Sequence, residues 1–349
     1  AEVEVAARLF SGFAEEGRRL FGRTIPMDAV PGCERHLAMT LRQPVGVVAA
    51  IVPFNYPVEL YAHKAAAALA AGNSVIAKPP SACPLALLEI AGILEGAGLP
   101  PAAHQMITGA GEMIGERLAS SPVVRLVSVT GSTAVGVRLA ELGAKNLQKI
   151  LLELGGNDAT IVCEDADLEK AATAIVLGRL ARGNGQICCA VKRVFVDSRV
   201  YDRFASLLAA KARAVRMGDQ LDEATELGPL ISEGAAKDVK AAIDGAVGAG
   251  AQLLAGGGRR GAVVEPTVLG KVPTQAPLFK EETFGPVVPL VAFDSVDEAV
   301  RMANDSPFGL QAAVFTRDLS RALSIAARLE AGGVIVNWSS ALRAEHVPF

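Results

Sequence analysis

Apolar runs of strand length alternate with helical segments along almost the whole chain. In the first half these runs lie at 46–52, 74–77, 105–108, 125–130 and 149–154. In the second half they lie at 159–163, 191–196, 265–269, 287–293, 311–315 and 333–337. The helical segments between them include 64–71 and 168–182. Continuous apolar runs that alternate with helices are typical of parallel strands covered on both faces. Since such crossovers are right-handed, the pattern predicts an α/β fold with a doubly wound, Rossmann-like layer in the first half.

Two interruptions divide this alternation. Residues 26–44 hold short alternating segments broken by prolines, which indicates a β-hairpin rather than part of a core. The pair Gly155-Gly156 separates the first series from the second. We therefore expect one domain built from residues 1–25 and 45–155, a hairpin arm at 26–44, and a second α/β domain at 156–349.

Composition narrows the class of protein. The chain has 349 residues, enough for two domains, with 51% hydrophobic residues, 20% charged residues and a formal net charge of -3. This balance gives no electrostatic basis for binding nucleic acid or an anionic membrane, and no apolar run approaches the ~18 residues of a membrane span. The five cysteines lack paired spacing, so we expect no disulfide framework and no metal site, and a reducing cytoplasm fits best. The chain begins without methionine and stops at Val347-Pro348-Phe349, and we expect both ends to be cut.

Polar residues follow several predicted strands of the first domain. Parallel sheets bind ligands at the carboxyl ends of their strands, where this chain has Asn55, Lys78, Gly131-Ser132 and Glu153. The segment Thr130–Thr133 joins a strand to a helix and offers backbone N–H groups to a phosphate, although an ordinary helix cap has the same sequence. The glycines of 109–115 have one residue too many for a dinucleotide fingerprint.

The pentapeptide Gly185-Gln186-Ile187-Cys188-Cys189 marks an abrupt turn between a helix and a strand. A thiol at such an edge is a candidate nucleophile if its pKa is lowered and a substrate can reach it. The alternative is that both cysteines are small buried hydrophobic residues.

Seven short stretches resemble one family in order and spacing. They are Pro53-Phe54-Asn55-Tyr56-Pro57, Ala77-Lys78-Pro79, Thr130-Gly131-Ser132-Thr133, Leu152-Glu153-Leu154-Gly155-Gly156, Gly185-Gln186-Ile187-Cys188, Glu265-Pro266-Thr267 and Glu281-Glu282-Thr283-Phe284-Gly285-Pro286. With them the sequence resembles the aldehyde dehydrogenase superfamily, the NAD(P)-dependent enzymes that oxidise aldehydes to carboxylic acids, over nearly its whole length. Each stretch alone is a weak signal, whereas seven in register favour the nucleophile over the buried cysteine.

The resemblance implies a mechanism and assigns its residues. Cys188, directly after Gly-Gln-x, would attack the aldehyde to form a thiohemiacetal. The Asn55 amide and the Cys188 backbone N–H would bind its oxyanion. Loss of hydride would leave a thioester, which water activated by Glu153 would hydrolyse. Because the coenzyme A-dependent branch lacks this base, Glu153 argues against it.

The resemblance also implies the cofactor contacts. Lys78 would bind the adenosine ribose, Gly131-Ser132 the pyrophosphate, Glu282 the nicotinamide ribose, and Phe284 would pack by the nicotinamide ring. Three residues beyond the lysine, an acid would disfavour NADP, and this chain has the uncharged Ser81 there. We expect use of NADP or NAD, with a leaning to NADP.

The substrate prediction is coarser. Residues 55–64 and 153–158 resemble the branch of lactaldehyde, glyceraldehyde-phosphate, succinate-semialdehyde and phosphonoacetaldehyde dehydrogenases, which act on small, polar and often anionic aldehydes. His63, Arg182 and Arg343 are candidates to bind an anion. Arg182 has the alternative of a helix-end charge, and His63 that of a helix histidine bonded to backbone. Ile187 replaces a basic residue of the phosphonate enzymes, so a short semialdehyde or hydroxyaldehyde is favoured and a phosphonoaldehyde is the alternative.

Three further expectations complete the sequence analysis. The hairpin at 26–44 resembles the arm through which the family forms dimers and tetramers, so a homodimer or homotetramer is expected. The adjacent Cys188 and Cys189 would form a strained disulfide on oxidation, which would block the nucleophile. The rival to an enzyme is a fragment with a structural or binding role.

Overall fold

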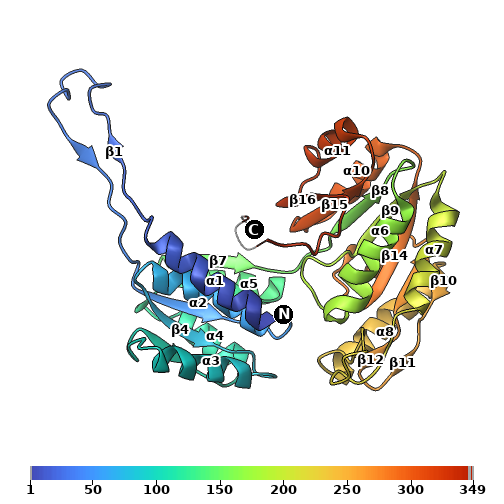
Figure 1. Cartoon of the computed structure of the whole chain (residues 1–349), viewed down its shortest axis with the longest axis horizontal. Coiled ribbons are helices and arrows are strands. Elements are labelled where there is room, and N and C mark those ends of the chain that lie inside the picture. The colour runs from blue at the N-terminus through green and yellow to red at the C-terminus, as the bar shows by residue number, and fades with distance from the viewer. Residues whose placement is uncertain (1, 345–346, 348–349) are drawn as a thin grey trace. The chain divides into compact units, whose positions relative to one another are not determined.

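The protein folds into two compact units, Ala1–Leu154 and Gly155–Phe349 (Figure 1). The structure is a computed structural model, and it describes residues 2–344 and 347. The division between the units lies one residue before the boundary expected from the sequence. Of the last three residues, Val347-Pro348-Phe349, the structure describes Val347, and the other two lie outside the described residues.

The first unit is built on a five-stranded parallel sheet. Its strands are β3 (Val47–Ile51), β4 (Ser74–Lys78), β5 (His104–Met106), β6 (Val124–Thr130) and β7 (Lys149–Glu153). Their order is β5-β4-β3-β6-β7. The chain therefore winds outward from β3 in one direction and from β6 in the other, as in a doubly wound fold. Ligands of such sheets bind where the order reverses, at the carboxyl ends of the strands.

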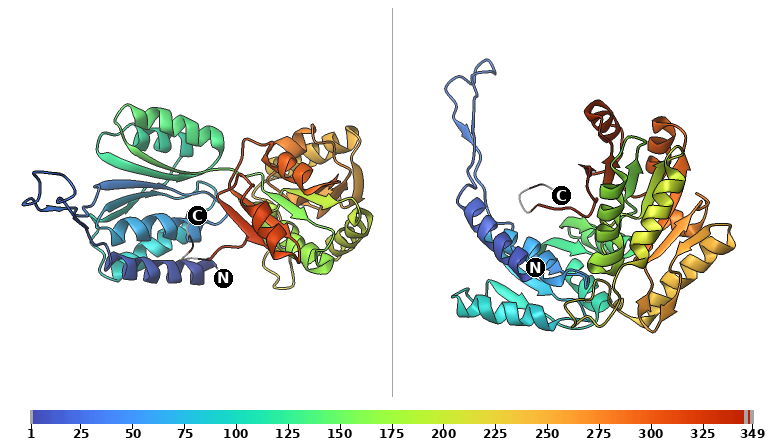
Figure 2. Two further views of the ribbon diagram at one scale, coloured as in Figure 1. Left: turned by 90° about the horizontal axis from the view of Figure 1, so that it is seen from above. Right: turned by 45° about the vertical axis from the view of Figure 1, so that its right-hand side comes forward.

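Helices cover both faces of this sheet (Figure 2). The apolar core on one face includes Val48 and Ala50 with α1 (Glu2–Gly17), α2 (Pro57–Ala70) and α3 (Leu85–Gly96). The core on the other face includes Ala49 with α4 (Gly111–Ala119) and α5 (Thr133–Ala144). Alternate residues of β3 thus enter opposite cores, which explains why the strand reads as a continuous apolar run.

One helix of the first unit begins earlier than predicted. The sequence indicated a helix at 64–71, whereas α2 starts at Pro57. Proline is well suited to the first turn of a helix, where its missing N–H has no intrahelical partner. The Pro57 that read as a loop residue is therefore the start of the helix.

The predicted hairpin is a long, narrow ribbon of the first unit (Figure 1). Its strands β1 (Thr24–Ile25) and β2 (Ala38–Met39) pair antiparallel over two residues each. The pairing begins two residues before the expected start at residue 26, and most of the arm is loop. Ile25, Leu37, Met39 and Leu41 are exposed on it.

The second unit is built on a seven-stranded sheet with the order β10-β13-β14-β9-β8-β15-β16. The strands are β8 (Ala159–Val162), β9 (Arg193–Asp197), β10 (Gln252–Ala255), β13 (Thr267–Gly270), β14 (Val287–Phe293), β15 (Gln311–Phe315) and β16 (Gly333–Val336). Only the β10–β13 pairing is antiparallel in this sheet. The α/β prediction is confirmed for both units.

Helices again form two cores. Val194 and Val196 of β9 face α6 (Leu168–Ile175) and α7 (Tyr201–Arg213), and Phe195 faces α8 (Glu233–Gly248), α10 (Val296–Asn304) and α11 (Leu319–Ala326). The pattern of apolar residues did not predict the strand β10 or the short elements α9 (Pro277–Lys280), β11 (Arg259–Arg260) and β12 (Val263–Val264). Among the described residues no helix is long and apolar enough to span a membrane.

The segment before the cysteine turn departs from the prediction. A helix was expected over 168–182, but α6 ends at Ile175 and continues as a π-helical turn, Val176–Ala181. A 3-10 turn, Arg182–Gly185, follows. Wide π turns occur mostly as short insertions in α-helices, frequently at functional sites.

Candidate active site

Four predicted residues of the first unit lie at the carboxyl edge of its sheet. Asn55 follows β3, Lys78 ends β4, Ser132 follows β6 and Glu153 ends β7. The last two strands are tied at this edge, because the Gly131 N–H donates to the Glu153 carbonyl oxygen at 3.0 Å. The topology thus brings these side chains to the sheet edge where α/β folds bind ligands.

Lys78 and Ser81, two of the predicted cofactor residues, are hydrogen-bonded to each other at the end of β4. The Lys78 Nζ donates to Ser81 Oγ at 2.9 Å, and Ser81 Oγ donates to the Gly109 carbonyl at 2.8 Å. Gly111 lies beside the ammonium, since a Cβ added there would be 3.7 Å from Lys78 Nζ. Ser132 caps α5 by accepting from Val135 N at 3.4 Å. The start of a helix can offer backbone N–H groups to a phosphate, and the predicted roles of Lys78 and Ser132 in binding a dinucleotide stay predictions.

A cation that the sequence analysis missed faces Glu153. Lys64 of α2 is only 7% exposed and its Nζ donates to Ser128 Oγ at 3.2 Å. Burial lowers the pKa of Lys64 to about 8, and the charge of Glu153 acts in the opposite direction. Lys64 is therefore a buried cation within the electrostatic reach of Glu153.

The cysteine turn of the second unit has a backbone that requires glycine. Gly183, Asn184 and Gly185 have φ values of 60°, 52° and 71°. A Cβ at Gly185 would lie 2.3 Å from the Gly285 carbonyl oxygen. The Asn184 side chain anchors the turn, since its Nδ2 donates to the Pro229 carbonyl at 2.9 Å and its Oδ1 accepts from Gly228 N at 3.0 Å. The turn is therefore rigidly placed before Cys188.

The two adjacent cysteines have different environments. Cys188 is half-buried, whereas Cys189 is 7% exposed. A hydrogen bond from Cys189 lowers the pKa of the Cys188 thiol to about 7, assisted by Lys192 and opposed by burial. The same hydrogen bond and burial raise the pKa of Cys189 well above its usual range. Of the two cysteines, Cys188 is the one that is partly exposed and has a lowered thiol pKa, the two properties that a nucleophilic cysteine needs.

Lys192, four residues beyond the nucleophile, binds three separate segments. Its side chain is 1% exposed, and its Nζ donates to the Gly156 carbonyl at 2.7 Å, the Cys188 carbonyl at 2.6 Å and Glu282 Oε1 at 2.5 Å. Glu282 Oε1 also accepts from Gly156 N at 3.2 Å. The Phe284 ring centroid lies 5.7 Å from Lys192 Nζ. The predicted residues Cys188, Glu282 and Phe284 thus surround one buried ammonium.

Arg179 connects the same turn and loop from the other side. It lies in the π-helical turn and is 1% exposed. Its guanidinium donates to the carbonyls of Val287 at 2.8 Å, Gly185 at 3.0 Å and Thr283 at 2.7 Å. One buried side chain therefore links the turn of Cys188 to the loop of Glu282.

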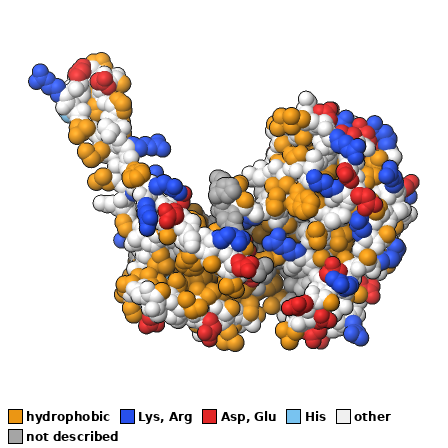
Figure 3. Space-filling model, viewed as in Figure 1, with side chains coloured by type: hydrophobic (Ala, Val, Ile, Leu, Met, Phe, Trp, Pro, Cys, Tyr) orange, Lys and Arg blue, Asp and Glu red, His pale blue; other side chains and the backbone are white. Residues whose placement is uncertain are grey.

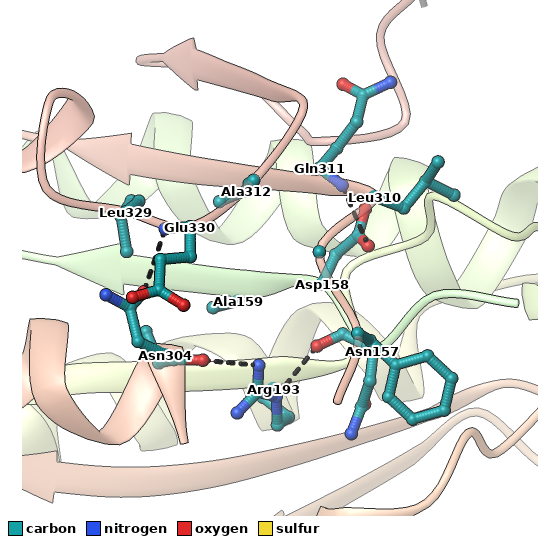
Figure 4. Close-up of a pocket in the computed structure, with 14 residues that line it drawn as sticks. Asn157, Asp158, Ala159, Arg193, Asn304, Leu310, Gln311, Ala312, Leu329 and Glu330 are labelled. Atoms are coloured by element: carbon teal, nitrogen blue, oxygen red, sulfur yellow. Dashed lines mark hydrogen bonds between the residues drawn. The ribbon is translucent and has the colours of Figure 1, made fainter. Parts of the chain in front are cut away.

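A pocket lined by residues of β8, β9 and β15 includes a further buried cation, Arg193, and a buried acid, Asp158 (Figure 4). Arg193 Nε donates to the Asn157 carbonyl at 2.8 Å, and its Nη2 to the Ala303 carbonyl at 2.9 Å. Asp158 is 2% exposed, and its Oδ1 accepts from Gln311 N at 3.3 Å. Burial raises the pKa of Asp158 to about 8, although Lys192 and the Gln311 N–H oppose it. Burial thus favours the neutral form of Asp158.

The predicted substrate residues differ in exposure. His63 and Arg343 are half-buried, and Arg182 is exposed at the end of the π-helical turn. The segment before Arg343 is joined to the cysteine turn, because Ser340 Oγ donates to the Cys189 carbonyl at 2.9 Å. Their roles in binding a substrate stay predictions.

The sequence contains a weak signal for the cations that were missed. Arg179 and Lys64 are isolated charges within Ala-rich helical segments, and Lys192 precedes a strand whose other residues are mainly apolar. A charge on an element that is otherwise buried is uncommon unless it is paired. The sequence thus indicates that these cations are buried, but it does not show which groups they bind.

Comparison with known proteins places the chain in a family. The profile of the Aldehyde dehydrogenase family matches residues 1–349. The chain is 42% identical over 348 residues to a 3-sulfolactaldehyde dehydrogenase of Priestia aryabhattai, covering 100% of this chain and 72% of that protein. It is 41% identical over 339 residues to the NADP(+) succinate-semialdehyde dehydrogenase of Escherichia coli K12, covering 96% and 69%. The crystal structure of an E. coli NADP-dependent enzyme superimposes with a TM-score of 0.95 at 39% identity, covering 99% of this chain and 71% of that one. The chain belongs to the aldehyde dehydrogenase family.

Proposed function

We propose that this aldehyde dehydrogenase oxidises a short anionic aldehyde to its carboxylate with Cys188 as the nucleophile. The observation that carries the proposal is the contrast within the cysteine pair. Cys188 is accessible and its pKa is lowered, while the adjacent Cys189 is buried and remains a thiol that donates to it. Both relatives described above are named for acidic aldehydes, which supports the substrate class.

The residues act in two half-reactions. The Cys188 thiolate adds to the carbonyl carbon, and the oxyanion formed accepts hydrogen bonds from the Asn55 amide and the Cys188 N–H. When bound, the nicotinamide cofactor supplies the acceptor for the hydride that leaves as the C=O bond reforms. Glu153 then takes a proton from water, whose oxygen adds to the thioester. The C–S bond breaks, and the products are the carboxylate and the regenerated Cys188 thiolate.

We assign the cofactor contacts to Lys78, Ser81, Ser132, Glu282 and Phe284, with a preference for NADP. Ser81 is uncharged, and its hydroxyl is held between Lys78 and the Gly109 carbonyl. An ammonium beside a neutral hydroxyl attracts a 2′-phosphate, whereas a carboxylate there would repel it. Ser81→Asp is expected to lower kcat/KM with NADP more than with NAD. Equal changes with both cofactors would argue against this assignment.

For the substrate we propose a short semialdehyde or hydroxyaldehyde with one negative charge, such as succinate semialdehyde, lactaldehyde carrying a 3-sulfonate, or a close analogue. The ratio of the steady-state kcat/KM values for succinate semialdehyde and for butanal, which lacks the carboxylate, measures how much the negative charge contributes to kcat/KM. A preference of at least about tenfold for the anion corresponds to one charge-assisted hydrogen bond. Phosphonoacetaldehyde, with two charges, is expected to be a poorer substrate because Ile187 is apolar and 7% exposed.

We also propose that the hairpin arm binds a second copy of the chain. Hydrophobic side chains gather along it (Figure 3), and Leu37 and Leu41 are each 74% exposed. Apolar side chains repeated on a projecting ribbon are typical of an interaction surface. Light scattering of the protein is expected to give a dimer or tetramer, and Leu41→Lys is expected to weaken it. A monomeric mass for the parent protein would contradict the proposal.

Two variants test the mechanism. Cys188→Ala is expected to abolish formation of NAD(P)H, and Cys33→Ala, which removes a cysteine far along the chain, serves as the matched control. Glu153→Gln is expected to release about one NAD(P)H per active site in a rapid burst and then stop, because the thioester forms but is not hydrolysed. Turnover by Cys188→Ala would refute the nucleophile, and steady turnover by Glu153→Gln would refute the base.

A further inference from the structure

Lys192 occupies a position that neither the proposed reaction nor the comparisons assign. It directly precedes β9, and its own N–H donates to the Asp158 carbonyl at 3.1 Å. We propose that Lys192 is a positioning residue that fixes Cys188 and Glu282 in one arrangement and whose charge favours the Cys188 thiolate. The inference rests on the proposed function for the roles of Cys188 and Glu282.

The geometry at Nζ is the first reason. An ammonium has three N–H donors, and each has an acceptor within 2.7 Å: the carbonyls of Gly156 and Cys188 and the Glu282 carboxylate. These acceptors come from three stretches of chain that are far apart in sequence. Because all three donors are used and the side chain is buried, the ammonium cannot turn to another partner without losing a hydrogen bond. Lys192 therefore holds the turn and the loop together.

The charge balance around Nζ is the second reason. The titratable and charged groups that face it are Glu282 from the loop, Asp158 from the segment before β8, Arg179 from the π-helical turn, and Cys188 and Cys189 from its own turn. Burial raises the pKa of Asp158 and so favours its neutral form, and Glu282 is the carboxylate that is hydrogen-bonded to Nζ. Two buried cations, Lys192 and Arg179, then face this carboxylate. The positive excess stabilises a second anion, and the accessible Cys188 thiol is the group that can supply it.

The placement of Glu282 is the third reason. Its Oε1 is bound by Lys192 Nζ and Gly156 N, and its side chain is 21% exposed. A Cβ at Gly155 would lie 2.2 Å from Glu282 Oε2, so the glycine is needed to leave room for the carboxylate. One oxygen is thus used to fix the side chain, and the other is left for a ligand such as the ribose hydroxyls of the cofactor.

The first test measures the thiolate without the cofactor. Alkylation of Cys188 by iodoacetamide is followed against pH by mass spectrometry of its peptide, in the full chain. Lys192→Met is expected to raise the midpoint by about one pH unit, the lower end of the effect of removing a nearby opposite charge. Below the midpoint this means about tenfold slower alkylation. Lys170→Met, at an exposed lysine of α6, is the matched control and is expected to match the parent.

The second test separates charge from geometry. Lys192→Arg keeps the positive charge but replaces three tetrahedral donors with a planar fork. It is expected to keep the alkylation midpoint of Cys188 near the parent value while raising KM for NAD(P) severalfold, since Glu282 is displaced. A solely structural role would lower kcat for Lys192→Met and Lys192→Arg alike without moving the midpoint, and that result would overturn the proposal.

The variant Glu282→Gln tests the effect of the Lys192 charge on Cys188 even if Lys192→Met does not fold. Glu282 raises the pKa of Cys188, so Glu282→Gln is expected to lower the alkylation midpoint by leaving the charge of Lys192 uncompensated. An unchanged or higher midpoint would overturn the proposal. If the proposed function is wrong, Cys188→Ala will still turn over the substrate. That result is independent of the alkylation of Cys188 in the Lys192 variants, so the two failures can be distinguished.

Discussion

The replacement Arg179→Met tests whether a buried guanidinium stabilises the second unit. The substitution removes the donors of three carbonyls, those of Val287, Gly185 and Thr283, at 2.8, 3.0 and 2.7 Å. Each carbonyl left without its donor costs about 1–3 kcal/mol, which gives about 3–9 kcal/mol before relaxation. Removing the cation also relieves a desolvation cost of several kcal/mol. We therefore expect a net loss of about 3 kcal/mol.

For a unit of this size 1 kcal/mol corresponds to about 2–4 °C, so the Tm of Arg179→Met is expected to fall by about 6–12 °C. Differential scanning calorimetry at pH 7.5 measures it, with Arg203→Met, at an exposed arginine of α7, as the matched control. The loops are expected to loosen together, so the alkylation rate of Cys188 in the native protein should change as well. A Tm equal to that of Arg203→Met would refute the reasoning.

Three further predictions follow from single observations. Gly185→Ala forces a side chain into φ 71° and toward the Gly285 carbonyl, so urea unfolding is expected to show at least about 1–2 kcal/mol of destabilisation; an unchanged midpoint would contradict the strained turn. Asp158 has a pKa raised to about 8 in the folded protein, so its stabilising contribution is full below the unfolded pKa of about 4 and is lost as pH rises through 8. Asp158→Asn is therefore expected to gain stability relative to the parent between pH 5 and pH 9, and a constant difference would count against it. Cys189→Ala removes the donor whose hydrogen bond lowers the pKa of Cys188, so the alkylation midpoint is expected to rise above about 7, whereas a fall would exclude that hydrogen bond.

The fold was largely predictable because its signals are local. Continuous apolar runs identified the parallel strands of both units, and the boundary at Gly155-Gly156 was placed within one residue. The errors occurred where local signals conflict. Pro57 reads as a breaker but begins α2, and the apolar stretch after Ile175 reads as a helix but widens into a π-helical turn. Short elements such as β11 and β12 are too small to show a period.

The site was predictable only in part. The motifs led to the predictions for Cys188, Glu153 and Lys78 because each lies at the end of a strand or after a turn with a recognisable sequence, and their roles stay predictions. Lys192 and Arg179 could not be assigned in this way. Their partners are mostly backbone carbonyls distant in sequence, and a carbonyl carries no information about its residue type. Such contacts depend on the path of the chain, which the pattern of side chains does not specify.

The concentration of buried cations beneath the cysteine turn has a physical origin in the turn itself. Three successive residues with positive φ and an interrupted helix leave the backbone of this region outside regular secondary structure. Its buried carbonyls still require donors. A single arginine or lysine provides several donors on one flexible stem, so Arg179 and Lys192 each bind carbonyls from separate segments. The charge of Lys192 also lowers the pKa of Cys188. The irregular backbone that places the thiol thus requires the same lysine that favours the ionised form of Cys188.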